Sequence, residues 1–252
     1  MSAVYVEITA TRGSAPRDAG TAMKITATGI KGTIGGGALE YSAIARAREI
    51  LAQALPDETR TLPLGPSLGQ CCGGSVSLRF GRTPTAIDET ARRVPCTATP
   101  PERPPLLWVW GAGHVGRAVI NACPPGLFDI TWVDSSASRF PETVDPDIAM
   151  IPATDMPRLA ARAPQEAHHL IFTYSHDIDL DLCATLLKRG FASCGLIGSA
   201  TKWARFQNRL QGTGFDPASI TCPIGDKSLG KHPDAIAAGT IQSLLSRLKA
   251  PA

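Results

Sequence analysis

The chain has 252 residues, 43% of them hydrophobic, and carries a formal net charge of +3. This length is enough for two domains, each able to bury a core of its own. The charge is small and no run of Lys or Arg concentrates it, which argues against nucleic acid or an anionic membrane surface as the partner.

The first part of the chain, residues 1–80, is predicted to form a small α+β domain. Strands are expected over residues 4–9, 21–26, 30–34, 61–64 and 75–80, and a helix over 38–54, where apolar residues recur at helical spacing. Gly35, Gly36 and Gly37 lie between the third strand and this helix. Backbone N–H groups at the start of a helix favour negative charge, so these glycines predict an anion site.

A second candidate anion site is the turn over residues 11–17, which contains Arg12 and Arg17. A guanidinium group holds a phosphate or a carboxylate through two parallel hydrogen bonds. The alternative is that both arginines are simply solvated on a loop. Proximity to the Gly35–Gly37 turn would favour binding, because both turns would then face the same anionic group.

Two adjacent thiols, Cys71 and Cys72, follow Gln70 in a glycine-rich turn expected between the last two strands of this domain. A thiolate is a soft nucleophile and a soft metal ligand, and glycines let the backbone approach a bound group closely. The pair therefore indicates sulfur or soft-metal chemistry. The alternative is that one of the two is a buried core residue, since neighbours in a strand point to opposite faces.

The cysteine count and the start of the chain indicate the compartment. The seven cysteines are an odd number without the spacing of a disulfide framework or a zinc site, so reduced thiols are expected. The first residues lack the pattern of a signal peptide, and no stretch reaches the roughly 18 apolar residues of a membrane span. A soluble, cytoplasmic protein is expected.

Residues 81–105 are rich in Pro, Thr and Arg and are predicted to be a linker. Beyond it, strands expected over residues 106–110, 130–133, 168–173 and 192–197 alternate with helices over 114–123, 180–189, 201–211 and 234–249. This alternation is typical of a doubly wound parallel sheet, so residues 106–252 are predicted to form a Rossmann-like domain. The predicted fold class is therefore α/β, with a small α+β domain preceding the Rossmann-like one.

Gly111, Gly113 and Gly116 form a G-x-G-x-x-G pattern that follows a predicted strand and opens a predicted helix, with His114 inside it. Asp134 ends the next strand, near the distance expected for an acid that binds ribose. A phosphate-bearing ligand is expected at this helix start. Three interpretations stay open: NAD(P), another phosphate-bearing cofactor, or a loop that serves packing alone.

His176, Asp177 and Asp179 come just after another predicted parallel strand, where ligands bind in such sheets. They could form a polar or proton-transfer cluster, or the aspartates could only cap the helix that follows. Ser199 and Lys202 lie at a further helix start, with Ser199 as a helix cap in the simpler interpretation.

Taken together, these segments resemble the XdhC/CoxI family of molybdenum cofactor insertion factors. The resemblance rests on residues 11–17 (TRGSAPR), 32–37 (GTIGGG), 65–74 (GPSLGQCCGG), 111–116 (GAGHVG), 173–179 (TYSHDID), 195–202 (GLIGSATK) and 222–225 (CPIG). An ordered set of this kind is highly specific, whereas any one member would not be. It covers nearly the whole chain.

The resemblance implies a factor that receives the pyranopterin molybdenum cofactor, supports replacement of a molybdenum oxo ligand by a sulfido ligand, and delivers the cofactor to apo xanthine dehydrogenase. The implied partners are the molybdenum subunit of that enzyme and a cysteine desulfurase or other sulfur donor, and a homodimer is expected. Cys71 or Cys72 would contact the metal or the sulfur, with Gln70 beside them. The glycine turns and Arg12 or Arg17 would hold the phosphate. The chain would then be a chaperone in purine metabolism with no catalytic residue of its own.

One departure from the family pattern concerns the Rossmann-like domain. After Asp134 the chain has Ser135 and Ser136, where many family members carry a further Asp or Arg. This weakens the transfer of any dinucleotide contact to Asp134.

Two other classes of function are weighed against the family interpretation. In the first, the chain is an oxidoreductase that binds NAD(P) at residues 111–116 and uses His176 with Cys71 or Cys72. In the second, the thiols are core residues and the chain is a scaffold between a sulfurtransferase and the dehydrogenase. A self-contained hydrolase is not indicated, because we find no nucleophile elbow and no paired carboxylates.

Overall fold

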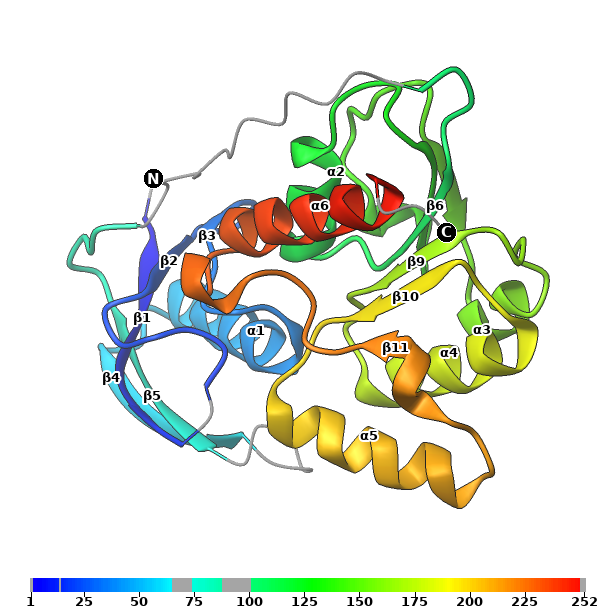
Figure 1. The fold of residues 1–252 in the computed structure, drawn as a ribbon. Coiled ribbons are helices and arrows are strands. Elements are labelled where there is room, and N and C mark those ends of the chain that lie inside the picture. Colours follow the sequence, from blue (N-terminus) through cyan, green and yellow to red (C-terminus); the bar gives the residue numbers. More distant parts are fainter. Residues whose placement is uncertain (1, 14, 65–73, 88–100, 250–252) are drawn as a thin grey trace. The chain divides into compact units, whose positions relative to one another are not determined.

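The computed structural model describes residues 2–13, 15–64, 74–87 and 101–249. The chain divides into two compact units, residues 1–90 and residues 91–252. The boundary lies within the segment predicted to be a linker. Figure 1 shows the fold of each unit, and the two units are described separately below.

Unit 1 is a five-stranded antiparallel sheet with one long helix. Its elements are β1 (Val4–Arg12), β2 (Ala22–Ile25), β3 (Ile30–Gly32), α1 (Gly37–Gln53), β4 (Glu58–Leu64) and β5 (Gly74–Gly81). The strand order is β3-β2-β1-β5-β4, and each neighbouring pair is antiparallel. The prediction of a small domain with mixed helix and strand is confirmed.

The core of unit 1 forms between the sheet and α1 because both elements are apolar on one side. Alternate residues of β1 face this core, and Val4, Val6 and Ile8 are fully buried. The buried positions of α1 recur every three or four residues, at Leu39, Ala43, Ala47 and Ile50. The helix therefore lies with a continuous apolar stripe against the sheet.

Unit 2 is built on a six-stranded parallel sheet. Its strands are β6 (Leu106–Trp110), β7 (Asp129–Asp134), β8 (Ala149–Pro152), β9 (His168–Ile171), β10 (Ser193–Leu196) and β11 (Ile220–Thr221). The order is β11-β10-β9-β6-β7-β8, with every neighbouring pair parallel. Strand order reverses between β6 and β9, which is the Rossmann arrangement. The predicted doubly wound domain is confirmed.

Helices cover both faces of this sheet (Figure 1). They are α2 (His114–Ala122), α3 (Met156–Ala160), α4 (His176–Arg189), α5 (Ala200–Gly212) and α6 (Pro233–Lys249). On one face α2 and α6 lie side by side over Val109 and Trp132, and on the other α3, α4 and α5 cover Trp110 and Val133. Consecutive strand residues therefore enter different cores, as expected for a strand buried on both faces.

Three short elements of unit 2, β8, α3 and β11, were not predicted. Strand β8 is an edge strand with three of its four residues exposed, and β11 has only two residues. Neither is long enough to show a hydrophobic period. Helix α3 has five residues and begins where the Asp155 side chain accepts a hydrogen bond from the Arg158 N–H.

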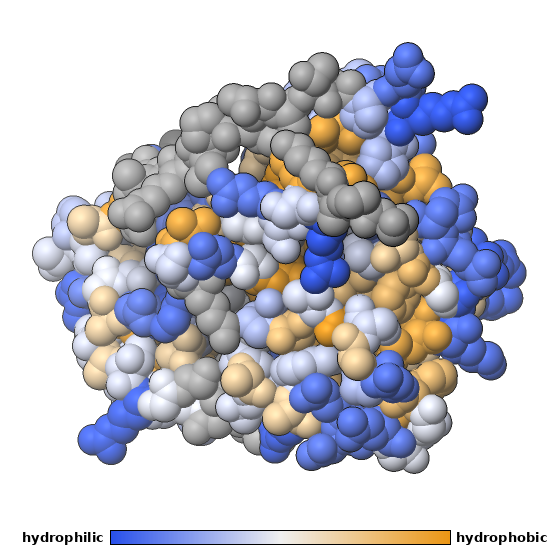
Figure 2. Space-filling model, in the orientation of Figure 1, coloured by the Kyte–Doolittle hydropathy of each residue, from blue (hydrophilic) through white to orange (hydrophobic). Residues whose placement is uncertain are grey.

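The side of α5 that faces away from the sheet is mainly polar. Helix α5 buries Lys202, Phe206 and Leu210 and presents a mainly hydrophilic outer side, visible at the lower part of Figure 2. Within the described residues, no helix is both long and apolar enough to cross a membrane.

Candidate functional site

The candidate site lies at the carboxyl edge of the parallel sheet, where strand order reverses between β6 and β9. Ligands of open α/β sheets bind at this edge, because the chain leaves the two neighbouring strands in opposite directions. We call residues 111–113, after β6, and residues 172–175, after β9, the switch-point loops. They touch directly: a Cβ on Gly111 would lie 2.5 Å from the carbonyl oxygen of Phe172.

The three glycines of the predicted motif have different physical roles. Gly111 has φ of 116° and lies against Phe172, so only glycine fits there. A Cβ on Gly116 would overlap the carbonyl oxygen of Gly111, so this glycine permits close packing of α2 on the loop. Gly113 has an ordinary φ of −74°, and apart from its own atoms and the adjacent backbone no described heavy atom lies within 4 Å of where its Cβ would be. The fold of unit 2 therefore does not require glycine at position 113.

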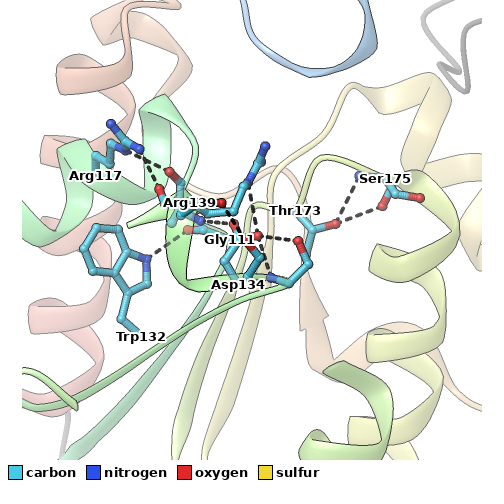
Figure 3. Close-up of polar contacts among 11 residues, drawn as sticks. Gly111, Arg117, Trp132, Asp134, Arg139, Thr173 and Ser175 are labelled. Atoms are coloured by element: carbon cyan, nitrogen blue, oxygen red, sulfur yellow. Dashed lines mark hydrogen bonds and ion pairs between the residues drawn. The ribbon is translucent and has the colours of Figure 1, made fainter. Parts of the chain in front are cut away.

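Side chains of β7 and α2 hold the loop after β6 in place (Figure 3). The Trp132 Nε1–H donates to the Gly111 carbonyl oxygen at 3.0 Å, and the Ala112 N–H donates to Asp134 Oδ2 at 2.6 Å. From α2, Arg117 donates through Nε to the Ala112 carbonyl oxygen at 2.9 Å. The loop is thus fixed at two consecutive residues and leads into the N-terminus of α2 at Gly113.

Asp134, the predicted ribose-binding acid, is fully buried, and both its oxygens accept hydrogen bonds within the chain. Besides the Ala112 contact at Oδ2, its Oδ1 accepts from the Ser135 N–H at 2.6 Å, the Ser135 hydroxyl at 3.0 Å and Arg139 Nε at 3.2 Å. The carboxylate therefore joins the glycine loop to the loop after β7. Binding of ribose by Asp134 stays a prediction.

Arg139 and Tyr174 were not among the predicted site residues, yet they lie together at this edge. The Arg139 Cζ lies 5.1 Å from the centre of the Tyr174 ring, and the residue Tyr174 is 43% exposed. Burial lowers the pKa of Arg139 from its ordinary value. Arg117 Nη2 donates to the Arg139 carbonyl oxygen at 2.5 Å, so the loop after β7 is tied to α2 as well. The rule that ligands meet residues at strand ends could have identified both side chains.

The loop after β9 is held by a buried ion pair. Asp179 Oδ1 accepts from the Thr173 hydroxyl at 2.6 Å, and Asp179 Oδ2 accepts from Lys202 Nζ at 2.5 Å. Lys202 also donates to the Ile197 carbonyl oxygen at 3.0 Å. Asp179 is fully buried and Lys202 is 5% exposed. This pair joins the loop after β9 to the loop after β10, so the predicted ligand-binding Lys202 has a clear structural contact.

The remaining predicted residues of unit 2 lie around this pair. His176 is half-buried, and burial together with the charge of Lys202 lowers its pKa to about 4, so the imidazole is neutral at pH 7. The Asp177 side chain is 88% exposed. The Ser199 hydroxyl accepts from the Lys202 N–H at 3.1 Å and caps α5. His114 is exposed in the first turn of α2.

In unit 1 the two predicted anion turns do lie together: a Cβ on Gly35 would be 2.5 Å from Pro16 Cβ and 3.5 Å from Arg17 Cγ. Arg12 is exposed, whereas Arg17 is buried. The carboxylate of Glu40 accepts from the Ile34 N–H at 3.0 Å and the Gly36 N–H at 3.1 Å. The Gly36 N–H, one of the donors of the predicted anion turn, therefore already has an acceptor in the chain.

The thiols Cys71 and Cys72, and Gln70 beside them, lie outside the described residues. Their predicted roles stay predictions. Among the described cysteines, Cys183 and Cys194 are buried, while Cys123 and Cys222 are partly exposed. Burial raises the pKa of the Cys183 and Cys194 thiols, which disfavours the reactive thiolate form.

Both units of the chain are similar to one family of proteins. A family model described as the XdhC Rossmann domain matches residues 107–242, and one described as the XdhC and CoxI family matches residues 1–62. The uncharacterized protein YqeB of Escherichia coli K12 is 25% identical over 246 residues, which are 95% of this chain and 42% of that protein. This chain therefore spans less than half the length of that relative.

Among solved structures, a crystal structure described as a xanthine dehydrogenase from Bacillus halodurans is similar, with a TM-score of 0.50 and 17% identity. The match covers 99% of this chain and 93% of that one. At this identity the likeness concerns the fold.

Proposed function

Because the chain belongs to the XdhC and CoxI family, we propose that it is an accessory factor for a molybdenum enzyme of the xanthine dehydrogenase type. In this proposal the chain binds the molybdenum cofactor, holds it while a sulfur donor supplies the sulfido ligand, and delivers it to the apoenzyme. The molybdenum subunit of xanthine dehydrogenase is the recipient, and the protein acts in the cytoplasm.

The open space at Gly113 carries this proposal. The cofactor is a flat pterin derivative with a phosphate group, and the start of α2 offers backbone N–H groups with room for a phosphate beside them. The packing of unit 2 does not require glycine at position 113. A ligand that approaches the backbone there would explain why the residue is glycine. The residues present therefore fit the phosphate end of the cofactor.

Tyr174 supports the same assignment for the heterocyclic part of the cofactor. The residue is 43% exposed in the loop after β9, and an exposed aromatic residue offers a platform on which a flat heterocycle can stack. Neutral His176 and the Ser175 hydroxyl lie in the same segment and offer polar contacts without an added charge. When bound, the cofactor supplies a molybdenum centre that accepts sulfur.

In unit 1, described by itself, we propose Cys71 or Cys72, with Gln70 beside them, as the residues that contact molybdenum or the incoming sulfur. Arg12 and Arg17, together with the Gly35–Gly37 turn, are further candidates for anionic parts of the cofactor. The contact between the Gly35 turn and Pro16 supports a shared role for the two segments. The hydrogen bonds of Glu40 reduce the number of backbone donors that remain for such a role.

The test compares protein purified from cells able to make the cofactor with protein from cells unable to make it. We expect molybdenum by metal analysis and a pterin by fluorescence after oxidation in the first sample, and activation of apo xanthine dehydrogenase by that sample only. Cys71→Ala and Cys72→Ala are expected to lower the molybdenum content, whereas Cys123→Ala, which changes a partly exposed thiol at the end of α2, is the control. Absence of both molybdenum and pterin, without activation of the apoenzyme, would refute the proposal.

A further inference from the structure

Unit 2 contains a cavity between its sheet and α6, which we call the α6 cavity. It has a volume of about 300 Å³, is open to solvent, and is lined by residues of β9, β10, β11, the loop after β11 and α6. We propose that the α6 cavity binds a short-chain monocarboxylate, with the carboxylate at Arg247 and the apolar tail between Leu170, Ile224 and Leu244. This inference goes beyond the proposed function, because it concerns a different site and a different class of ligand.

The α6 cavity is separate from the candidate site described above. Its lining begins at Ser193, the first residue of β10, and Arg247 lies in the last turn of α6. The switch-point loops follow the carboxyl ends of β6 and β9, and none of their residues lines the cavity. A ligand in the α6 cavity would therefore leave the glycine loop at Gly113 free.

The first argument is the state of Arg247. Its Nη2 donates to Thr221 Oγ1 at 2.7 Å, which fixes the guanidinium group against β11 at the cavity wall. Within the described residues, the Nε and Nη1 atoms of Arg247 form no hydrogen bond and no carboxylate forms an ion pair with it. A guanidinium group has five N–H donors and can hold a carboxylate through two parallel hydrogen bonds. Arg247 therefore offers an oriented positive charge without an acidic partner in the described chain.

The second argument is the set of polar groups beside Arg247. The Thr221 hydroxyl accepts from Arg247, so its own hydrogen can be donated to a ligand oxygen. The Ser193 hydroxyl lies 2.8 Å from Nδ1 of His168, a residue only 9% exposed, and no described residue forms a hydrogen bond with Nε2 of that imidazole. Burial, together with the charge of Arg247, lowers the pKa of His168, so its imidazole is neutral at pH 7. Arg247 is thus the cation at this end of the cavity, with neutral polar groups around it.

The third argument concerns the class of anion. Leu170 and Leu244 are 2% and 5% exposed, and with Ile224 they give the cavity apolar walls that suit a hydrocarbon tail. Arg247 lies in the last turn of a helix, where backbone carbonyl groups carry partial negative charge and disfavour a dianion such as phosphate. A volume of about 300 Å³ is at the lower end for ligand cavities, which favours a ligand of a few carbon atoms.

The test measures dissociation constants of the full chain for butyrate, for the uncharged butyramide of the same size, and for inorganic phosphate, by ligand-observed NMR titration. The protein comes from cells that lack molybdenum cofactor. We expect butyrate to bind with a dissociation constant of about 0.1–1 mM, and the other two compounds to bind at least about 10-fold more weakly.

Arg247→Ala is expected to weaken butyrate binding about 10-fold or more, and Arg247→Lys to weaken it less, because lysine keeps the charge without the planar pair of donors. Thr221→Val, which removes the hydroxyl and leaves Arg247 in place, is expected to weaken binding by about 3- to 10-fold. Arg162→Ala changes an exposed arginine of the same unit and is the control, with no expected change. Thermal unfolding of each ligand-free variant shows that it is folded.

Three results would each overturn the inference: butyramide or phosphate binding as tightly as butyrate, unchanged butyrate binding in a folded Arg247→Ala variant, or no binding of butyrate at about 10 mM. The molybdenum content of protein from cofactor-producing cells is a separate measurement, so either proposal can fail without the other.

Discussion

Replacing two glycines of one motif, Gly113 and Gly116, is expected to have opposite consequences. A Cβ at position 116 overlaps the Gly111 carbonyl oxygen, so Gly116→Ala must push α2 away from the loop. Overpacking of this kind costs about 3 kcal/mol of the free energy of unfolding. For a unit of this size, that loss lowers the melting temperature by about 6–12 °C.

Gly113→Ala is expected to be nearly neutral for stability. The new Cβ meets no described atom within 4 Å, and a φ of −74° is allowed for alanine. Alanine is a poorer N-cap than glycine, but it reduces the conformational entropy of the unfolded chain, and the two effects offset each other to within about 1 kcal/mol. The methyl group does occupy the space assigned to a phosphate, so ligand binding should be lost.

The assay combines thermal unfolding of both variants, followed by tryptophan fluorescence, with molybdenum analysis of protein from cofactor-producing cells. We expect a folded Gly113→Ala protein that contains no molybdenum and a destabilised Gly116→Ala protein. If Gly113→Ala unfolds as early as Gly116→Ala, the space beside Gly113 is not open. If it stays folded and contains as much molybdenum as the unchanged chain, the glycine is not there for the cofactor.

Three further predictions concern titratable side chains that the structure buries fully or in part. Lys202→Met leaves the Asp179 carboxylate buried without its cation, so we expect the free energy of unfolding, measured by urea denaturation, to fall by about 3–5 kcal/mol. The double variant with Asp179→Asn should recover much of this loss. If the losses of the two single variants simply add in the double variant, the pairing is contradicted. Glu40→Gln weakens the hydrogen bonds from the Ile34 and Gly36 N–H groups near the start of α1, and we expect it to lower the free energy of unfolding in urea by about 1–3 kcal/mol. An unchanged urea midpoint would count against this role of Glu40. The pKa of His176 is about 4 in the folded chain and 6.5 when unfolded, so the unfolded state binds more protons between these values and stability falls as pH decreases from about 6.5 to 4. His176→Gln should flatten this decline, and an identical pH profile would show that His176 does not cause it.

Much of the fold could be predicted from the sequence because its long elements have clear periods. The alternation of apolar strands and helices after residue 105 predicts the doubly wound sheet, and the mixed pattern before residue 81 predicts the smaller domain. Strands β8 and β11 were missed because an exposed edge strand of four residues and a pair of residues carry no period. Their place is decided by pairing with β7 and β10.

Some features of the candidate site could likewise be predicted from the sequence, and others could not. The positions of Gly111, Gly113 and Gly116 follow from local pattern, since a strand, a glycine turn and a helix are consecutive in the chain. The role of Asp134 does not, because its hydrogen bond to Ala112 spans 22 positions and forms only when β6 and β7 lie side by side. The same holds for Arg139 beside Tyr174, which belong to loops on opposite sides of β6.

The sequence by itself determined the family, the Rossmann-like architecture and the location of the glycine turn after β6, because each depends on the order and spacing of residues along the chain. Only the tertiary structure decided which side chains hold that turn. The sequence does not show whether the carboxylate of Asp134 is exposed or is buried with hydrogen bonds from Ala112, Ser135 and Arg139. That depends on the residues that folding brings within hydrogen-bond distance, and the order of the strands fixes which residues these are.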